Sequence, residues 1–232
     1  MDACWFIESK PAVSGQNADD TSFIGGRPRI PAGVDLPQCR LCGADLTFFY
    51  QVAFPAGHVW QSLSMAVFAC TSCAHEEYLI PEMLTGVLAG ADIPQGFLTQ
   101  YQRNFRIVVF ETRSGEQRMD YTPKIRFNRL ELVPSKKTAA KRNKLGGKPN
   151  WLLDDESPAT YASSVPMKFL MQWIEPPRFD LEDDAPAQIR LGLRGKPEPS
   201  RHRYYELFLG NQLYFFGTEA GHEPLVYVIT QI

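Results

Sequence analysis

The chain carries the sequence LTFFYQV at residues 46–52. Apolar side chains occupy both faces of this stretch, which predicts a central strand buried on each side. Gln51 is the exception, because a buried amide group without a hydrogen-bond partner destabilises a fold. We therefore expect Gln51 to bond to loop backbone across an interface between lobes, in preference to binding a ligand.

The sequence MKFLMQW at residues 167–173 repeats this pattern, and its Gln172 lies 121 residues after Gln51. The same offset relates GGRP at residues 25–28 to GGKP at residues 146–149. In each copy the paired glycines permit a left-handed backbone, and the proline fixes the direction in which the chain leaves. Two such copies predict two pseudo-symmetric β-rich lobes that arose by internal duplication.

The duplication also predicts the domain organisation. The expected units are residues 1–22, an N-terminal strand and mobile segment; residues 23–133, the first lobe; residues 134–145, a basic linker; and residues 146–232, the second lobe. With 18 prolines and 17 glycines the expected class is mainly β with minor α (α+β). Strands are expected near residues 5–7, 46–54, 64–70, 76–80, 105–112, 125–133, 167–174, 188–193, 203–209, 212–217 and 225–230, and short helices near residues 82–88 and 93–103.

Four of the five cysteines form two identically spaced pairs, Cys39 with Cys42 and Cys70 with Cys73. Two residues between the thiols let one tight turn aim both sulfurs at a single tetrahedral ion. The gap between the pairs leaves room for a strand to run out and return. The pattern predicts a structural Zn²⁺ site of four sulfurs, with no open position for catalysis.

Other interpretations of these cysteines stay open. The pairs could be unlinked reduced thiols or a redox CxxC motif, and His58 or His75 could replace one sulfur. In the second lobe, Thr160 and Ser163 occupy the positions that match the first cysteine pair. We therefore expect metal to hold the first lobe and packing alone to hold the second.

Composition and charge argue against several classes of protein. The 232 residues are 44% hydrophobic, which is ample for a core, yet no apolar run approaches the roughly 18 residues of a membrane span. The formal net charge of −2 argues against electrostatic binding of nucleic acid along the whole chain. The N-terminus lacks the basic region of a signal peptide, so we expect a cytoplasmic protein without a membrane partner.

Three charged segments are candidates for contacts with a partner. Residues 136–144 are basic and could bind nucleic acid or an acidic partner, or be a solvated connector. A basic loop at residues 194–203 and an acidic run at residues 180–184 lie between strands of the second lobe, where loops tend to carry function. The candidate partner-binding residues are Asp180, Glu182, Asp183, Asp184, Arg194, Lys196 and Arg201.

The sequence offers no motif that requires catalysis. It contains no phosphate-binding loop, no GxGxxG and no GxSxG. Its four histidines do not fall in HExxH or another catalytic spacing. We therefore expect that the protein is not an enzyme.

The motifs of the first lobe resemble the N-terminal part of the programmed cell death protein 2 family. The resemblance rests on GGRP at residues 25–28, CRLCGADLTFFYQV at residues 39–52 and VFAC at residues 67–70. The second lobe, with FLMQ at residues 169–172 and NQLYFFG at residues 211–217, is similar to the same family and to bacterial YwqG-like proteins. These groups together form the TYPP superfamily.

The resemblance implies a duplicated β-rich fold without an established catalytic site. Eukaryotic members act as dedicated chaperones for a ribosomal small-subunit protein, and some bacterial relatives are linked to toxin–immunity systems. The leading hypothesis is therefore a non-enzymatic protein-binding module of the TYPP/YwqG type. It would hold a partner protein or peptide in a chaperone-like or adaptor-like way, with Zn²⁺ rigidifying the first lobe.

Two alternatives accompany this hypothesis. The protein could be an immunity protein that neutralises a cognate bacterial toxin by inserting residues 180–184 or 194–203 into the toxin's cleft. It could also be an RNA-binding or ribosome-assembly factor that uses basic residues 136–144. A ribosomal-type client, a cognate toxin and RNA are thus the expected partners to distinguish.

Overall fold

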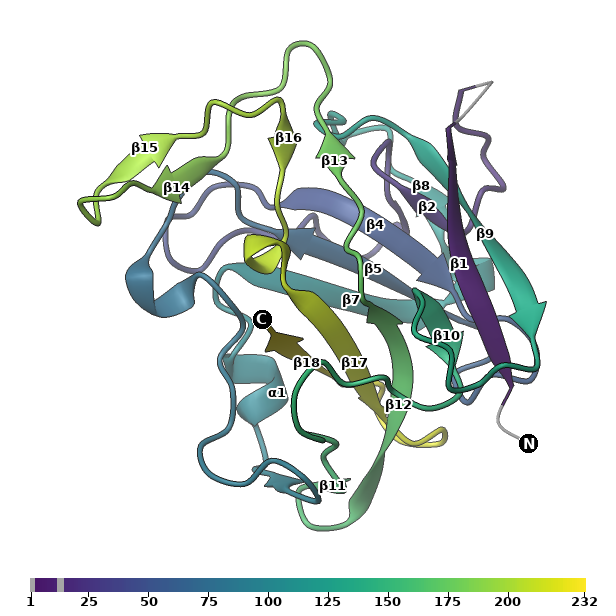
Figure 1. Cartoon of the computed structure of the whole chain (residues 1–232). Helices are drawn as coiled ribbons and strands as arrows, with labels where there is room; N and C mark the ends of the chain where they lie inside the picture. The colour runs from purple at the N-terminus through teal and green to yellow at the C-terminus, as the bar shows by residue number, and fades with distance from the viewer. Residues whose placement is uncertain (1–2, 12–14) are drawn as a thin grey trace.

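The computed structural model describes residues 3–11 and 15–232, and strands dominate it (Figure 1). The expected mainly β class with few helices is confirmed. Residues 1–2 and 12–14 of the predicted N-terminal segment lie outside the described residues. Ten strands of the twelve-stranded main sheet form one continuous row. The ten are β1 (Cys4–Pro11), β2 (Phe23–Ile24), β4 (Thr47–Ala53), β5 (Leu63–Ala69), β7 (Phe105–Glu111), β9 (Asn128–Ser135), β10 (Lys144–Gly146), β12 (Val165–Trp173), β17 (Gln212–Thr218) and β18 (Val226–Gln231). The other two, β6 (Asp92–Ile93) and β11 (Thr160–Tyr161), join the row through the pairing of β11 with β12.

These ten strands pair in the order β18-β17-β12-β10-β1-β9-β2-β4-β5-β7, with every neighbouring pair antiparallel. Shorter elements surround this row of strands. They are β6 (Asp92–Ile93) with β11 (Thr160–Tyr161), β3 (Arg29–Ile30) with β8 (Glu116–Gln117), β13 (Phe179–Asp180) with β16 (Tyr204–Tyr205), β14 (Ile189–Leu191) with β15 (Pro197–Pro199), helix α1 (Phe97–Gln100), and the 3-10 turns Glu76–Tyr78, Thr112–Ser114 and Phe208–Gly210.

Three local predictions are wrong between residues 76 and 103. The expected strand at residues 76–80 is a 3-10 turn, and residues 82–88 form no helix. Gly86, with φ of +91°, breaks the helical path in that segment. The expected helix at residues 93–103 shortens to Phe97–Gln100, because it begins only after Gly96, which has φ of +83°.

The sheet folds over so that its two ends pack face to face (Figure 1). Aromatic rings fill the space between the layers. The Tyr50 ring of β4 meets Trp173 of β12 edge to face at 5.5 Å between centroids, and it meets Phe215 of β17 at 6.4 Å. Strands from residues 23–133 and from residues 146–232 therefore share one apolar core.

β1 lies at the centre of the sheet, between β9 and β10. The expected N-terminal strand thus exists and is longer than residues 5–7. Trp5 of β1 pairs with Leu145 of β10, whereas Phe23 of β2 pairs with Arg129 of β9. The N-terminal strand β1 therefore joins the part of the sheet that contains β10, whereas β9 and β2 pair within residues 23–135.

The pairing register repeats at the 121-residue offset. Phe23 pairs with Gln51 in the first part of the chain, and Lys144 pairs with Gln172 in the second. The bulge of β4 at residues 48–50 and the bulge of β12 at residues 169–171 also follow this offset.

The two repeated glutamines are buried and hydrogen-bonded to loop backbone, as predicted. The loops belong to the same part of the chain as each glutamine, so the expected bonds across an interface are wrong. The chain that follows each glycine pair turns back over its own strand. Gln51 accepts from Arg29 N–H at 3.1 Å and donates to Thr21 C=O at 3.2 Å, and Gln172 accepts from Asn150 N–H at 2.9 Å and donates to Arg142 C=O at 2.8 Å.

The loop between β4 and β5 ties the two layers together. The Trp60 ring N–H donates to Thr218 C=O at 2.7 Å, and His58 Nε2 donates to Leu170 C=O at 3.0 Å. Because His58 Nδ1 accepts the Trp60 backbone N–H at 3.0 Å, the proton of the neutral ring lies on Nε2. Burial lowers the pKa of His58 to about 4, which makes it a neutral structural residue.

Replacing either buried glutamine by leucine should lower the free energy of unfolding by about 1–3 kcal/mol, because two backbone groups of the neighbouring loops lose their partners. Chemical denaturation of Gln51→Leu and Gln172→Leu measures this loss. Gln100→Leu, at an exposed position of α1, is the control and should be close to neutral. Neutral behaviour of all three variants would contradict the role of the buried amides.

Stability should also depend on the protonation of His58. The unfolded ring binds a proton near pH 6.5, whereas the folded ring resists protonation down to a pKa of about 4. The stabilisation is therefore present above pH 6.5 and is lost as the pH falls, by about 2 kcal/mol between pH 7 and pH 5. Denaturation at both pH values should show a smaller loss in His58→Gln, while the exposed-site control His222→Gln keeps the full loss.

Candidate metal centre

The cysteine pairs flank two neighbouring strands of the sheet. Cys39 and Cys42 precede β4, and Cys70 and Cys73 follow β5. Because β4 and β5 are antiparallel, with Thr47 opposite Ala69, the start of one strand lies beside the end of the other. This pairing brings together thiols that are about thirty residues apart in the sequence.

The four sulfurs have the separations expected of a tetrahedral metal site. The Sγ–Sγ distances are 3.4 Å for Cys70–Cys73, 3.7 Å for Cys42–Cys70 and 3.9 Å for Cys39–Cys73, and all four lie within 4.8 Å of one another. Four sulfurs at about 2.3 Å from one Zn²⁺ would be about 3.8 Å apart. The cluster can therefore hold a metal ion, as the spacing predicted, and the cysteines form no disulfide.

The first pair sits on a turn that glycine makes possible. Gly43 has φ of +74°, and its N–H donates to Cys39 C=O at 2.8 Å. The Cys39 N–H in turn donates to Ala44 C=O at 2.8 Å. This closed turn aims the Cys39 thiol inward, where it is buried, and leaves Cys42 at the surface.

The backbone carbonyl groups of two adjacent residues accept hydrogen bonds from the two cysteine turns. Arg103 C=O accepts the Arg40 N–H at 2.8 Å, and Asn104 C=O accepts the Cys70 N–H at 2.7 Å. The Asn104 amide group also donates to Tyr78 C=O at 2.6 Å. The segment just before β7 therefore fixes the two cysteine turns relative to each other.

The thiols differ in how readily they ionise. Burial raises the pKa of Cys70 to about 11. At Cys42 burial also opposes ionisation, but hydrogen bonds from the Ala44 amide and from the other three thiols outweigh it and lower the pKa. A bound cation favours thiolate at every position, so this donor set suits a soft divalent metal. The cluster consists of cysteines alone: His58 is held in the core, and His75 is not part of it.

A carboxylate occupies the corresponding place in the second part of the chain. Asp92 accepts a hydrogen bond from Thr160 Oγ1 at 2.6 Å and further bonds from Ser163 N–H at 2.8 Å and Oγ at 3.1 Å. Thr160 and Ser163 are the residues that match Cys39 and Cys42. At this turn Asp92 adds hydrogen bonds, while the expectation that packing holds the second lobe as a whole stays a prediction.

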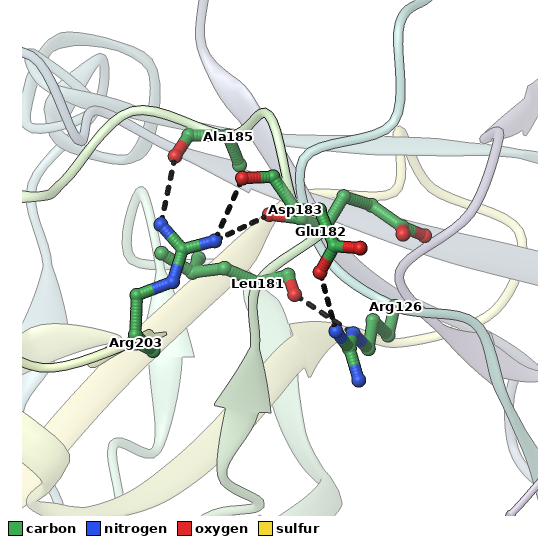
Figure 2. Close-up of polar contacts among 6 residues, drawn as sticks. All are labelled: Arg126, Leu181, Glu182, Asp183, Ala185 and Arg203. Carbon is green, nitrogen blue, oxygen red and sulfur yellow. Dashed lines mark hydrogen bonds and ion pairs between the residues drawn. The ribbon is translucent and has the colours of Figure 1, made fainter.

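The acidic run is clamped by two arginines (Figure 2). Arg203 donates to the backbone carbonyls of Glu182, at 3.0 Å, and Asp183, at 2.9 Å. Arg126 donates to Leu181 C=O at 2.9 Å and pairs with the Asp183 carboxylate at 2.8 Å. Neither arginine was expected to contact the acidic run. Arg126 lies far from it in the sequence, and Arg203 belongs to the loop at residues 194–203, which was expected to contact a partner.

The other partner-binding candidates lie on separate elements. Arg194 and Lys196 belong to the tip of the β14–β15 hairpin, and Arg201 is exposed in the turn that follows β15. Asp180 pairs with Arg178 at 3.0 Å. Glu182 is partly buried, and Asp184 is exposed in the clamped loop.

One lysine of the basic segment at residues 136–144 has a structural role. Lys144 is fully buried, and its Nζ donates to Thr138 C=O at 2.8 Å, Ala140 C=O at 3.1 Å and Asn150 Oδ1 at 2.7 Å. Burial lowers its pKa to about 8. Lys144 therefore organises the loop and adds no charge to its surface, while Lys136, Lys137, Lys141 and Arg142 are exposed.

No known protein family, curated protein or solved structure matched this chain. The resemblance to the TYPP superfamily therefore stays a prediction. Among the residues described, no helix is long and apolar enough to cross a membrane.

Metal analysis of the purified protein should find one bound ion per chain. Cys42→Ser should abolish that binding and lower the melting temperature, because the affinity of a structural metal contributes directly to folding. Cys4→Ser, which alters the fifth cysteine in β1, is the matched control and should retain the ion. Equal metal content in both variants, or equal melting temperatures with and without chelator, would contradict a structural ion.

Proposed function

We propose that the protein is a non-enzymatic module that binds a partner protein through the β14–β15 hairpin. The observation that carries this proposal is the composition of the hairpin tip. Leu193 is fully exposed there, with Arg194 and Lys196 beside it, and the hairpin projects from the body of the molecule (Figure 1). An apolar side chain with two cations beside it suits an apolar pocket with an acidic rim.

The base of the hairpin is anchored to the candidate metal centre. The Ile189 N–H donates to the C=O of Thr71, which lies between two of the metal-ligand cysteines, at 2.9 Å. Arg190 pairs with Glu206 at 2.9 Å, and both side chains are partly buried. A rigid base lowers the entropy lost when the tip is bound, which links the metal to partner affinity.

The proposal includes a structural Zn²⁺ at the four cysteines. Four thiolates in tetrahedral spacing are the donor set that Zn²⁺ takes in closed structural sites. The ion would stabilise both cysteine turns and, through Thr71 in the second of them, the hairpin. It would have no free coordination position for a substrate.

An internal duplication is part of the same proposal. Its support is the constant 121-residue offset of the glycine pairs, the bulges and the two glutamine hydrogen-bond sets. A duplicated β-rich chain of this kind fits the resemblance to the TYPP superfamily. A chaperone-like or adaptor-like role toward a ribosomal-type client would follow from it.

The hairpin also supports one specific alternative, an immunity protein. A narrow projecting element with Leu193 at its tip could enter the cleft of a toxin. RNA binding through residues 136–144 has less support, because Lys144 is buried and Arg142 both pairs with Glu8 at 3.4 Å and lies over the Phe6 ring.

The test starts with tagged protein purified from its native host, with co-purifying proteins identified by mass spectrometry. The affinity of the one stoichiometric partner, purified separately, is then measured by calorimetry. Leu193→Asp should weaken it by at least about tenfold, as should the Arg194→Glu/Lys196→Glu pair. Val87→Asp, at another exposed apolar residue, is the control and should bind normally.

The identity of the partner separates the alternatives. A ribosomal protein would support the chaperone-like role, and a toxin would support the immunity role. Nuclease-sensitive RNA without a protein partner, or a partner that binds the Leu193→Asp variant at full affinity, would overturn the proposal.

A further inference from the structure

The two outermost strands of the main sheet, β7 and β18, each have a neighbour on one side only. Adjacent residues after α1 bond to both free edges. The Gln102 side-chain oxygen accepts the Ile107 N–H of β7 at 2.8 Å, and the Tyr101 hydroxyl donates to Val226 C=O of β18 at 2.7 Å. The Tyr101 hydroxyl also accepts the Val228 N–H at 3.3 Å. Tyr101 and Gln102 therefore connect the free edge of β18 to the free edge of β7.

Beyond Ile107, the outer edge of β7 stays open. Because Ile107 N–H bonds to Gln102, it points away from β5, and backbone direction alternates along a strand. Val109 must therefore also direct its N–H and C=O outward. Within the described residues no group bonds to this Val109 N–H or C=O. Such a free edge can template the addition of another strand.

A groove runs along this free edge. It has a volume of about 810 Å³, and β7 lines it together with residues 34–38 and residues 223–226. Apolar side chains, among them Leu36 and Leu225, lie in its lining. An extended peptide could thus bury alternate side chains while its backbone pairs with β7.

The lining of the groove includes one cation, Arg106, and two carboxylate residues, Asp35 and Glu223. Arg106 of β7 lines the groove and is half-buried. Among the described residues it forms no ion pair, and the charge of Arg40, in the first cysteine turn, acts on it. Burial, and then the charge of Arg40, lowers the pKa of Arg106. A carboxylate paired with the Arg106 guanidinium would offset the repulsion from Arg40.

We propose that this groove binds an extended segment of a partner protein that carries an acidic side chain. The segment would add a strand to β7 through Val109, and its carboxylate would pair with Arg106. The site goes beyond the hairpin contact, since it lies on different elements and does not require Leu193.

A second copy of this chain is a less suitable occupant. The free part of β7 lies in a recess between residues 34–38 and residues 223–226. A second β7 would bring the same flanking segments into the space that its partner strand must enter. A single extended peptide has no such segments.

The experiment uses the full-length protein and a fluorescein-labelled peptide of alternating threonine and valine with one central aspartate. Fluorescence anisotropy should show saturable binding. The same peptide with lysine in place of aspartate should bind about tenfold more weakly, as should the aspartate peptide to Arg106→Gln. Peptides N-methylated at alternate residues should lose binding, because they cannot complete the backbone ladder.

Two protein variants complete the test. Val109→Pro removes an N–H that faces away from β5, so the sheet should tolerate it while peptide binding falls. Leu193→Asp should keep full peptide affinity, which separates this site from the hairpin contact. Circular dichroism and metal content confirm that each variant is folded.

Three results would overturn the proposal. They are the absence of saturable binding, binding that N-methylation leaves unchanged, and equal affinity for the aspartate and lysine peptides. A concentration-dependent dimer in sedimentation that Val109→Pro abolishes would assign the groove to a second copy instead.

Discussion

The antiparallel pairing of β1 with β9 is the constraint on which the rest of the fold depends. Eight consecutive residue pairs join these strands, from Cys4 with Ser135 to Pro11 with Asn128. β1 then continues into the layer built on β10, and β9 into the layer built on β2. The layer that contains β10, β12, β17 and β18 thus takes in β1 from the N-terminal end of the chain, and this exchange of β1 joins the two layers. The shared aromatic core is a consequence of this exchange.

The turns before β4 and before β12, which lie 121 residues apart, are stabilised by different chemistry. Before β4 the turn carries cysteines and can take a metal ion, whereas before β12 the Asp92 carboxylate binds Thr160 and Ser163. Thiolates around a cation form a compact joint that excludes water, and a carboxylate with hydroxyl donors leaves an exposed one. The metal side also carries the base of the β14–β15 hairpin and the arginines at the β7 groove. Both proposed contacts thus lie on the side of the molecule that carries the four cysteines.

The sequence predicted those features that short-range patterns encode. Apolar and β-branched runs located β4, β5, β7, β12, β17 and β18, and the CxxC spacing located the metal site. The exchange of β1 and β9 could not be read in this way, because strand order depends on pairing between distant residues. For the same reason, the contacts of Arg126 and Arg203 with residues 181–185 could not be predicted from the sequence (Figure 2). The helix expected at residues 82–88 does not form, and Gly86 within it takes a left-handed backbone conformation that interrupts a helix.

The central place of β1 has a consequence for synthesis on the ribosome. Its pairing partners, β9 and β10, are translated more than one hundred residues later. Until they emerge, β1 is an apolar strand with two free edges, and β2 lacks its outer neighbour. Contacts of such long sequence separation slow folding and expose unpaired edges to aggregation. The nascent chain therefore stays dependent on its own second half, and it becomes compact only when that half has left the exit tunnel.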